Sequence, residues 1–389
     1  MKTIRDLADQ LAGKRVLMRV DFNVPVDKVT GEITNDLRIR MALPTIQFAA
    51  ERGARVILMS HFGRPKGKPD PQYSLKKVAD RLGELMGAEV AFASDCVGPG
   101  AESAVDALAN GQVLMLENTR FHAEEEENDP DFSARLAALG DFYVNDAFGT
   151  AHRAHASTAG VAEHLPSAAG FLIEKEIDYL SRATKNPDHP YVAVMGGAKV
   201  SDKIQVLRNL LDKVDAMLIG GAMAYTFLKH QGVGVGASLV EEDRLDVAAE
   251  LLELGGDKIM LPVDHVCAQK IDPEAEVRTF EDEIPDGWIG LDIGPKTIAR
   301  YEQKIKEAAL VTWNGPVGYF EIDAFAAGTK AVARAMAASD ATTIVGGGET
   351  AEAVEELGLQ DQIRHVSTGG GASLAFLGGE ELPGITALD

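Results

Sequence analysis

Short, nearly uninterrupted apolar runs alternate along this chain with longer segments in which apolar residues recur every three or four positions. The runs in the first half are RVLMRV (15–20), RVILMS (55–60), EVAFA (89–93), VLMLE (113–117) and DFYVND (141–146). Because such runs lack alternating polar residues, they are typical of parallel strands that are buried on both faces. The segments between them, at 39–53, 74–87 and 131–140, are predicted to be helices.

The second half repeats this pattern with further apolar runs. They are YVAVMGG (191–197), AMLIGG (216–221), KIMLPVD (258–264), AALVTWNG (308–315), ATTIVGGG (341–348) and RHVSTGGG (364–371). Strands that alternate with helices form a parallel sheet with helices on both faces. The sequence therefore predicts an α/β protein with two doubly wound parallel-sheet domains.

The boundary between the predicted domains falls near the middle of the chain. A length of 389 residues corresponds to about two or three domains. The segment at 171–187 is predicted to be one helix that Pro187 ends, because a residue before proline is pushed out of the helical region. The expected division is an N-terminal domain over 1–170, a connecting helix over 171–187, a C-terminal domain over 188–373 and a tail over 374–389.

Charge and cysteine content argue against several classes of protein. The formal net charge is −22, which argues against nucleic acid as a partner, because binding a phosphate backbone requires basic surface. Cys96 and Cys267 have no spacing typical of a structural metal site, so we expect reduced thiols in a cytoplasmic protein. The N-terminus lacks the apolar core of a secretory leader, and no run approaches the roughly 20 residues that span a bilayer. We expect no membrane partner.

The first half carries charged loops just past its predicted strands, where α/β sheets bind ligands. Arginine pairs bidentately with phosphate or carboxylate, so clustered arginines suit a small polyanion. In so acidic a chain, positive charge must be gathered at one place to bind an anion. The candidates are Arg38, His61, Arg64, Arg120 and Arg153, with Asp21 and Asn23 beside them. These last two could bind a substrate hydroxyl or hold the arginines in place.

The second half carries glycine loops: GGAKVSDK (196–203), GGA (220–222), NGPVG (314–318), GGGET (346–350) and STGGGAS (367–373). Glycine lets backbone N–H groups approach nucleotide phosphates closely. The first loop is expected to open a helix, which would place Lys199 and Lys203 one turn apart on one face. Glu349, beside Thr350, is the candidate Mg²⁺ ligand, and Glu321 could bind ribose hydroxyls. The expected helix start at 369–373 suits an anion on which charge develops.

Three other patterns receive simpler interpretations. His152 and His155 could be metal ligands on a helix face, but no completing ligand has suitable spacing, so we expect an ordinary loop. The acidic run at 124–127 is interpreted as a solvated turn. The sequence GVGVGA (232–237) matches a dinucleotide fingerprint but follows a helical pattern instead of a strand, so it is interpreted as a loop and gives little support to an NAD-dependent dehydrogenase.

Taken in order, the motifs resemble those of the phosphoglycerate kinase family. They are RVDFNVP, SHFGRP, ENTRF, NDAFGTAHRAHAS, GGAKVSDKI, WNGPVG and STGGGASL, with LPG at 382–384. The resemblance implies two Rossmann-like domains joined by a helix and hinge, with the tail returning to the first domain. It also implies a monomer in which the first domain binds 3-phosphoglycerate or 1,3-bisphosphoglycerate and the second binds Mg²⁺ with ADP or ATP.

The resemblance also assigns roles to residues. The acid substrate would be held by Asp21, Asn23, Arg38, His61, Arg64, Arg120 and Arg153. The nucleotide pocket would contain Gly197, Lys203, Gly220, Gly221, Gly315, Glu321, Gly347, Gly348, Glu349 and Thr350. Arg38, Lys199, Gly370 and Gly371 would act on the phosphoryl group in transfer, and Glu349 would hold the metal.

The implied reaction is reversible phosphoryl transfer between 1,3-bisphosphoglycerate and ADP, by in-line transfer on domain closure and without a covalent enzyme intermediate. This sequence departs from the family's usual residues at Glu349, where aspartate is common, and at Tyr319, Phe62 and Ala375. Alternatives are a kinase for another small acid and a nucleotide-binding relative without turnover.

Overall fold

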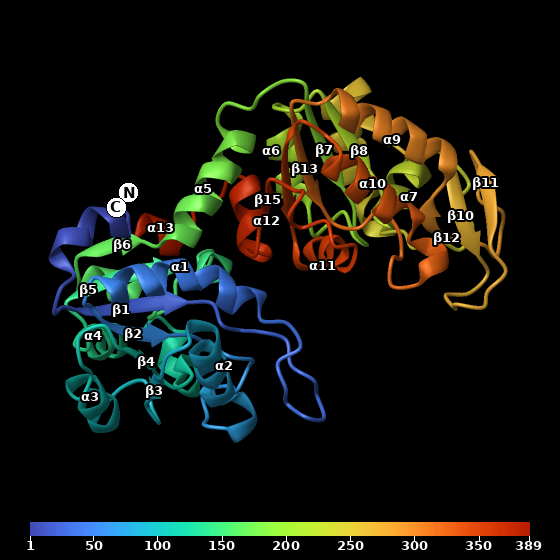
Figure 1. Ribbon diagram of the computed structural model, residues 1–389. Helices are drawn as coiled ribbons and strands as arrows, with labels where there is room; N and C mark the ends of the chain where they lie inside the picture. The colour runs from blue at the N-terminus through green and yellow to red at the C-terminus, as the bar shows by residue number, and fades with distance from the viewer. The chain divides into compact units, whose positions relative to one another are not determined.

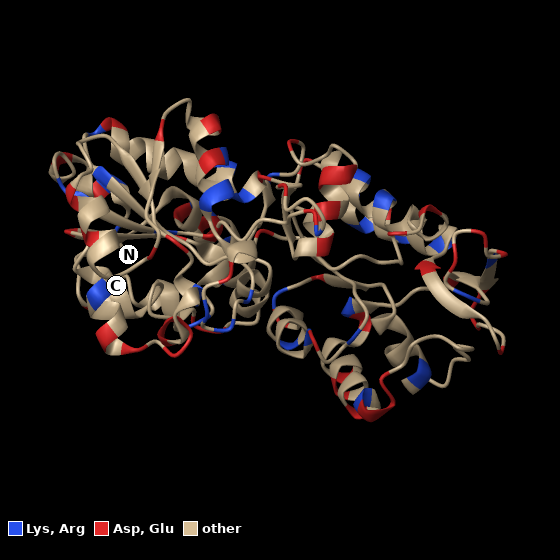
Figure 2. Ribbon diagram, turned by 90° about the horizontal axis from the view of Figure 1, so that it is seen from below, with Lys and Arg blue, Asp and Glu red and all other residues tan.

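The computed structural model describes residues 1–389, which form two compact units. Unit 1 consists of Met1–Ile177 together with Glu381–Asp389, and unit 2 consists of Asp178–Glu380. The helix α5 (Phe171–Thr184) contains the division between them, and it ends three residues before Pro187. No helix is long and apolar enough to cross a membrane. Figure 2 shows acidic residues along helices and loops of both units, in keeping with the strongly negative net charge.

Unit 1 is built on a six-stranded parallel sheet with the strand order β3-β4-β2-β1-β5-β6. Its strands are β1 (Arg15–Val20), β2 (Arg55–Met59), β3 (Val90–Phe92), β4 (Val113–Met115), β5 (Phe142–Asp146) and β6 (Ser167–Ala169). All neighbouring pairs are parallel, so the carboxyl ends of all six strands lie at one edge. This edge positions the first candidate site.

Helices lie on both faces of the unit 1 sheet (Figure 1). They are α1 (Leu37–Glu51), α2 (Lys76–Met86), α3 (Pro99–Asp106), α4 (Pro130–Ala137) and the first half of α5. In β1, Val16 and Met18 pack in one core cluster with residues of α1 and α2. Leu17, which faces the other side, is also fully buried. Burial on both faces explains why these strands have no polar alternation.

Unit 2 contains a second six-stranded parallel sheet, with the order β15-β14-β13-β7-β8-β9. Its strands are β7 (Tyr191–Met195), β8 (Ala216–Ile219), β9 (Ile259–Met260), β13 (Leu310–Asn314), β14 (Thr342–Gly346) and β15 (His365–Val366). The helices around it are α6 (Ile204–Leu211), α7 (Met223–His230), α8 (Leu245–Gly255), α9 (Pro295–Glu307), α10 (Ala327–Ala337), α11 (Gly348–Glu356) and α12 (Gly371–Leu377). The predicted α/β class with two parallel sheets is confirmed.

A small antiparallel sheet in unit 2 was not predicted. It has the order β11-β10-β12 and consists of β10 (Asp264–Ala268), β11 (Arg278–Glu281) and β12 (Ile289–Ile293). The predicted single strand at 258–264 is therefore wrong, because β9 ends at Met260 and β10 begins at Asp264 in another sheet. Pro262 lies between them, and proline cannot donate to a strand ladder.

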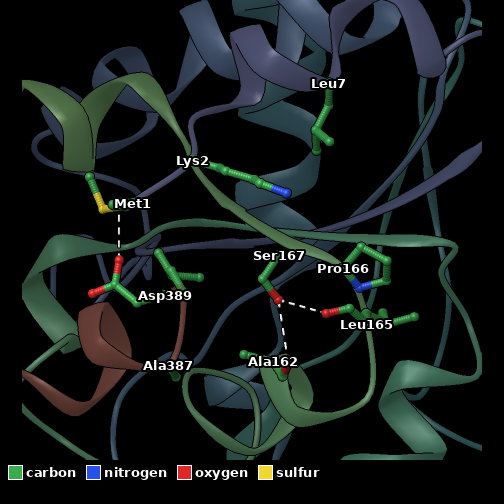
Figure 3. Close-up of a pocket in the computed structure, with 10 residues that line it drawn as sticks. Met1, Lys2, Leu7, Ala162, Leu165, Pro166, Ser167, Ala387 and Asp389 are labelled. Atoms are coloured by element: carbon green, nitrogen blue, oxygen red, sulfur yellow. Dashed lines mark hydrogen bonds and ion pairs between the residues drawn. The ribbon is translucent and has the colours of Figure 1, made fainter.

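The last residues of the chain pack against unit 1. A short helix, α13 (Pro383–Thr386), is held there because Asn145 Nδ2 donates to the Gly384 carbonyl at 2.9 Å and Gly384 N–H donates to the Ala151 carbonyl at 2.9 Å. The Met1 amino group pairs with the Asp389 carboxylate at 3.1 Å, so the two chain ends meet. Figure 3 shows the cavity of about 440 Å³ that they border, with Lys2 and Ser167 in its lining.

Candidate active site

The arginine cluster of unit 1 lies at the carboxyl edge of four neighbouring strands, β4, β2, β1 and β5. We use this name for Asp21, Asn23, Arg38, His61, Arg64, Arg120 and Arg153. Asp21 and Asn23 follow β1, His61 and Arg64 follow β2, Arg120 lies in a short 3₁₀ turn after β4, and Arg153 follows β5. Because neighbouring parallel strands end side by side, residues separated by as much as a third of the chain are brought to one place.

Asp21 orients Arg38. Arg38 lies in the first turn of α1, and its Nη1 donates to Asp21 Oδ2 at 2.9 Å and to the Asn23 carbonyl at 3.1 Å. Asp21 is nearly buried, whereas a third of the Arg38 side chain stays exposed. Of the two roles left open by the sequence, this contact shows that Asp21 holds an arginine in place.

The loop after β2 is tied to both of its neighbours through Gly63. Asn23 Oδ1 accepts from Gly63 N–H at 2.9 Å, and Arg120 Nη1 donates to the Gly63 carbonyl at 3.0 Å. Asn118 adds a third tie, because its Nδ2 donates to the Phe62 carbonyl at 2.7 Å. These bonds fix Arg120, whose side chain is almost fully buried and pairs with Glu126 at 3.2 Å.

A buried arginine that the sequence interpretation did not single out supports His61. Arg19, within β1, is fully buried; its Nε donates to Ser157 Oγ at 2.7 Å and its Nη2 lies 3.2 Å from His61 Nδ1. Burial, followed by the charges of Arg19, Arg120 and Arg38, holds the pKa of His61 well below its usual range. His61 is therefore a neutral imidazole at physiological pH. A charged residue inside an apolar strand was the available sequence signal.

The acidic run at 124–127 is not simply a solvated turn, and that interpretation is wrong for Glu125. Glu125 is fully buried, and its carboxylate accepts from Ser157 N–H at 2.9 Å, from Ser157 Oγ at 2.5 Å and from Thr119 Oγ1 at 3.3 Å. Arg19 and Glu125 thus bind the same serine hydroxyl from two sides. The pair joins the segments that carry Arg120 and Arg153.

Arg64 and Arg153 differ from the other arginines because both are exposed. No hydrogen bond or ion pair to Arg64 exists within the chain, and Arg153 Nε contacts only His152 Nε2, at 3.3 Å, through its side chain. His152 and His155 lie in a loop outside any helix or strand, as the loop interpretation expected. Burial and the charges of Arg120, Arg19 and Arg153 lower the pKa of His155 to about 4.

In unit 2, the glycine loops pack backbone against backbone at the carboxyl edge of β7, β8 and β13. Gly197 N–H donates to the Pro316 carbonyl at 2.9 Å, and Gly221 N–H donates to the Val317 carbonyl at 2.9 Å. Gly315 has φ +90°, and a Cβ there would lie 2.3 Å from the Gly196 carbonyl oxygen. Only glycine allows this approach, so the three loops pack closely together, with Gly220 and Gly315 buried and Gly197 and Gly221 partly exposed.

Lys199 and Lys203 do not lie one turn apart on a helix, and that prediction is wrong. The helix α6 begins only at Ile204, and both lysines precede it. The turn is held outside the helix because Glu241 accepts from Ser201 N–H at 3.1 Å and from Ser201 Oγ at 2.6 Å. Lys199 is exposed, whereas Lys203 is nearly buried and donates to Asn314 Oδ1.

Burial lowers the pKa of Lys203 to about 8, although the charges of Glu349 and Asp202 act in the opposite direction. Its partner Asn314 is also buried, and Asn314 Nδ2 makes no hydrogen bond within the chain. Asn314 is a polar residue at the end of β13. The sequence places it just past a predicted strand and beside glycines but assigns it no role.

The loop at 346–350 opens α11. Gly347 has φ +93°, Gly348 is exposed, and Glu349 lies exposed in the first turn of the helix. Thr350 is buried, and its Oγ1 accepts from Gly315 N–H at 2.7 Å, so it connects this loop to the neighbouring one. An exposed carboxylate at this place suits Mg²⁺, which keeps several waters and takes one or two carboxylates plus phosphate oxygens.

Three other candidates lie elsewhere on unit 2. Glu321 is exposed in the segment between β13 and α10, close in sequence to Tyr319, which is 41% exposed. Gly370 has φ +51° and precedes α12, whose first residue is Gly371. The helix start is held by Ser367, whose Oγ lies 2.6 Å from Ser373 Oγ and accepts from Gly369 N–H at 3.1 Å.

Comparison with known proteins identifies the family. The phosphoglycerate kinase family profile matches residues 4–380. A phosphoglycerate kinase of Thermosipho africanus is 56% identical over 394 residues, covering 99% of this chain and 97% of the relative. One of Rubrobacter xylanophilus is 55% identical over 388 residues, covering 100% and 98%. The structure of phosphoglycerate kinase from Coxiella burnetii superposes with a TM-score of 0.89 at 44% identity, covering 99% and 98%.

The chain belongs to the phosphoglycerate kinase family. It is an enzyme of the kinase class, and its reaction is reversible phosphoryl transfer between 1,3-bisphosphoglycerate and ADP in glycolysis. The predicted family, fold and reaction are therefore confirmed. An NAD-dependent dehydrogenase is excluded as the main function, and the GVGVGA segment at 232–237 is a loop with one isolated bridge at Val235.

Proposed function

We propose that the arginine cluster binds 3-phosphoglycerate or 1,3-bisphosphoglycerate, and that the glycine loops bind ADP or ATP with Mg²⁺. One observation carries the first assignment. Four arginines, Arg38, Arg64, Arg120 and Arg153, follow neighbouring strands at one edge of the sheet, and after burial the charges of Arg19, Arg120 and Arg38 further lower the pKa of His61, although the chain as a whole has a net charge of −22. Positive charge is thus concentrated at the carboxyl edge of the unit 1 sheet, where an acidic chain needs it to attract a small polyanion.

Different members of the cluster take different parts in binding. Arg64 and Arg153 are exposed and have few internal partners, so they can close on the substrate phosphate. Arg38 is already oriented by Asp21, and its exposed portion can pair with the substrate carboxyl or the phosphoryl group in transfer. Asn23, His61 and Arg120 complete the site as hydrogen-bonding groups that the loops hold in fixed positions.

On unit 2, the backbone surface around Gly197, Gly220, Gly221 and Gly315 would accept the nucleotide. Lys203 and the unpaired Asn314 Nδ2 offer donors to phosphate oxygens. Lys199, exposed on the preceding turn, would stabilise the phosphoryl group in flight, together with the backbone N–H groups near Gly370 and Gly371. Glu321 would bind the ribose hydroxyls.

Glu349 would hold Mg²⁺, in the loop that also contains Gly347 and Gly348. Its carboxylate is exposed, and its charge acts on Lys203 by raising the pKa of that lysine against the effect of burial. A cation bound at Glu349 would therefore lie near the proposed phosphate donors. When bound, Mg²⁺ neutralises charge on the nucleotide phosphates. Thr350 supports the site indirectly, because its hydroxyl fixes Gly315.

The reaction needs no nucleophile from the protein, because the acyl phosphate is already activated. The bond from the acyl oxygen to phosphorus breaks as a terminal oxygen of ADP bonds to the same phosphorus, leaving 3-phosphoglycerate and ATP. Catalysis then rests on in-line positioning and charge stabilisation. We propose that the two units close on their substrates for the transfer and exclude water from the acyl phosphate.

A coupled assay tests the assignment. We expect ATP consumption that requires both 3-phosphoglycerate and Mg²⁺, with no change in NADH when the coupling enzymes are omitted. Transfer from a chiral phosphoryl donor should invert configuration at phosphorus, as a single in-line displacement requires. Net retention of configuration at phosphorus would show a covalent enzyme intermediate. Absence of turnover with intact nucleotide binding would favour the alternative of a nucleotide-binding relative without turnover.

Scattering in solution tests closure separately. The radius of gyration should decrease only when both substrates are present, and an unchanged value would contradict closure while leaving the two binding sites intact. The same measurement gives the molecular mass and so tests the predicted monomer. The cytoplasmic location stays a prediction.

A further inference from the structure

Three potential metal ligands of different chemistry gather in unit 1 outside the arginine cluster. Asp95 and Cys96 lie in the loop between β3 and α3, and His122 follows the 3₁₀ turn after β4. Because β3 and β4 are paired neighbours in the sheet, the segments that follow them leave the same edge. One carboxylate oxygen, the Cys96 sulfur and one imidazole nitrogen all lie within 4.8 Å of one another.

Two of the three side chains already contact each other, and the backbone of the third is bound to the same carboxylate. His122 Nε2 lies 2.7 Å from Asp95 Oδ1, and the same oxygen accepts from Cys96 N–H at 2.7 Å. The carboxylate and the imidazole are partly exposed, at 47% and 25% of their side chains, while Cys96 is buried behind them. Two of the three ligands are therefore open to solvent, and the thiol is shielded from it.

We propose that Asp95, Cys96 and His122 form a binding site for a thiophilic divalent cation of the Zn²⁺ class. Sulfur, imidazole nitrogen and carboxylate oxygen are the donors that Zn²⁺ takes in proteins, and three protein ligands leave a fourth tetrahedral position for water. Bond lengths of about 2.0–2.3 Å require donor atoms about 3–4 Å apart. The 4.8 Å limit on the present separations means that small side-chain rotations suffice.

The thiol explains why this ion differs from the Mg²⁺ of the proposed nucleotide site. The cation would bind Cys96 as a thiolate, so one proton would leave Sγ to solvent for each ion bound. Mg²⁺ prefers oxygen ligands and cannot compete for the sulfur.

Cobalt spectroscopy on the full-length, metal-free protein tests the proposal, because a thiolate bound to Co²⁺ gives a charge-transfer band in the near ultraviolet. We expect such a band to saturate at one Co²⁺ per chain, to disappear on addition of Zn²⁺, and to persist in excess Mg²⁺. The chain has only two cysteines, and the other, Cys267, lies buried in unit 2. Cys267→Ser is therefore the matched control and should keep the band.

Cys96→Ser should abolish the band, and Asp95→Asn and His122→Gln should each weaken Zn²⁺ binding at least tenfold in competition with a chromophoric chelator. These last two positions are partly exposed, so their variants test the site even if Cys96→Ser fails to fold, which circular dichroism would reveal. No charge-transfer band in the parent protein, or a band unchanged in both Asp95→Asn and His122→Gln, would overturn the proposal.

Discussion

The arginine cluster and the glycine loops are built by opposite means. In the cluster, charged side chains are held by other side chains: Asp21 orients Arg38, and Arg19 contacts His61. In the glycine loops, backbone contacts backbone, and the absence of Cβ atoms sets the geometry. Charged groups must be paired before they can be buried, whereas a backbone surface needs only room to approach. The first site should therefore be sensitive to charge, and the second to volume.

Substitution of Arg38 is expected to cause the largest loss of activity, and it tests the sensitivity of the arginine cluster to charge. Arg38→Met should lower kcat/KM by on the order of 10²–10³, because it removes a preorganised charge from the proposed transfer site. Arg40→Met is the matched control, since Arg40 lies on the same helix but is half exposed and pairs only with Asp36. Steady-state kinetics in both directions measure the change, and equal losses in the two variants would contradict a specific role for Arg38.

Gly315 tests the dependence on volume in unit 2. Gly315→Ala should lower the free energy of unfolding by about 2–4 kcal/mol, because a Cβ would add overpacking against the Gly196 carbonyl to the cost of a positive φ. Gly232→Ala is the control: Gly232 has φ +81°, but a Cβ there would meet nothing within 4 Å. Denaturant titration should show the smaller loss in the control. Equal losses of unfolding free energy in the two variants would show that the close approach of the loops at Gly315 does not contribute to stability.

The variant Glu125→Gln tests whether the buried carboxylate of Glu125, which the sequence did not reveal, stabilises the segments that carry the arginine cluster. Glu125→Gln should lower the free energy of unfolding by about 1–3 kcal/mol, because the amide cannot accept all the bonds that Ser157 and Thr119 donate. Glu124→Gln, on the exposed neighbour, should change it by less than about 0.5 kcal/mol. Thermal unfolding of the two variants provides the test. An unchanged free energy of unfolding in Glu125→Gln would show that its hydrogen bonds to Ser157 and Thr119 do not stabilise the fold.

Lys203 is the one buried charge among the glycine loops and gives the smallest expected effect. Its pKa is lowered to about 8 in the folded chain, so between pH 8 and about 10.5 the unfolded chain binds more protons. Stability therefore rises with pH through this window. Relative to Lys203→Met, the wild type should gain about 1 kcal/mol between pH 7 and pH 9. Denaturation of both proteins without ligand at the two pH values measures this, and a constant difference would contradict the lowered pKa.

The central strands of both sheets could be predicted from sequence because burial on both faces leaves an uninterrupted apolar run. The antiparallel sheet of unit 2 could not, because β11 is largely exposed and polar and therefore has no such run. Its partner β10 was merged with β9 across Pro262. Hydrophobicity reports burial, and it carries little information about strands at a surface.

The residues of the candidate site likewise divide into those that could be predicted from the sequence and those that could not. Residues at strand ends, such as Asp21 and Arg120, could be found because the position itself predicts ligand binding. Glu125 could not, because a buried glutamate in an acidic run resembles its solvated neighbours until its partner Ser157 is placed 32 positions away. The group formed by Asp95, Cys96 and His122 likewise depends on the pairing of β3 with β4, which no spacing rule reports.

The return of residues 381–389 to unit 1 has a consequence for biosynthesis. Because this segment belongs to unit 1, the unit cannot be completed until residues 381–389 have left the ribosome. Unit 2 is one continuous segment, Asp178–Glu380, and all of it is synthesised before that point. A C-terminal truncation or an unreleased nascent chain would therefore leave the docking place of α13 at Asn145 and Ala151 uncovered while unit 2 already has its whole sequence. The order of folding during translation is thereby constrained, because residues that complete unit 1 are synthesised after the whole of unit 2.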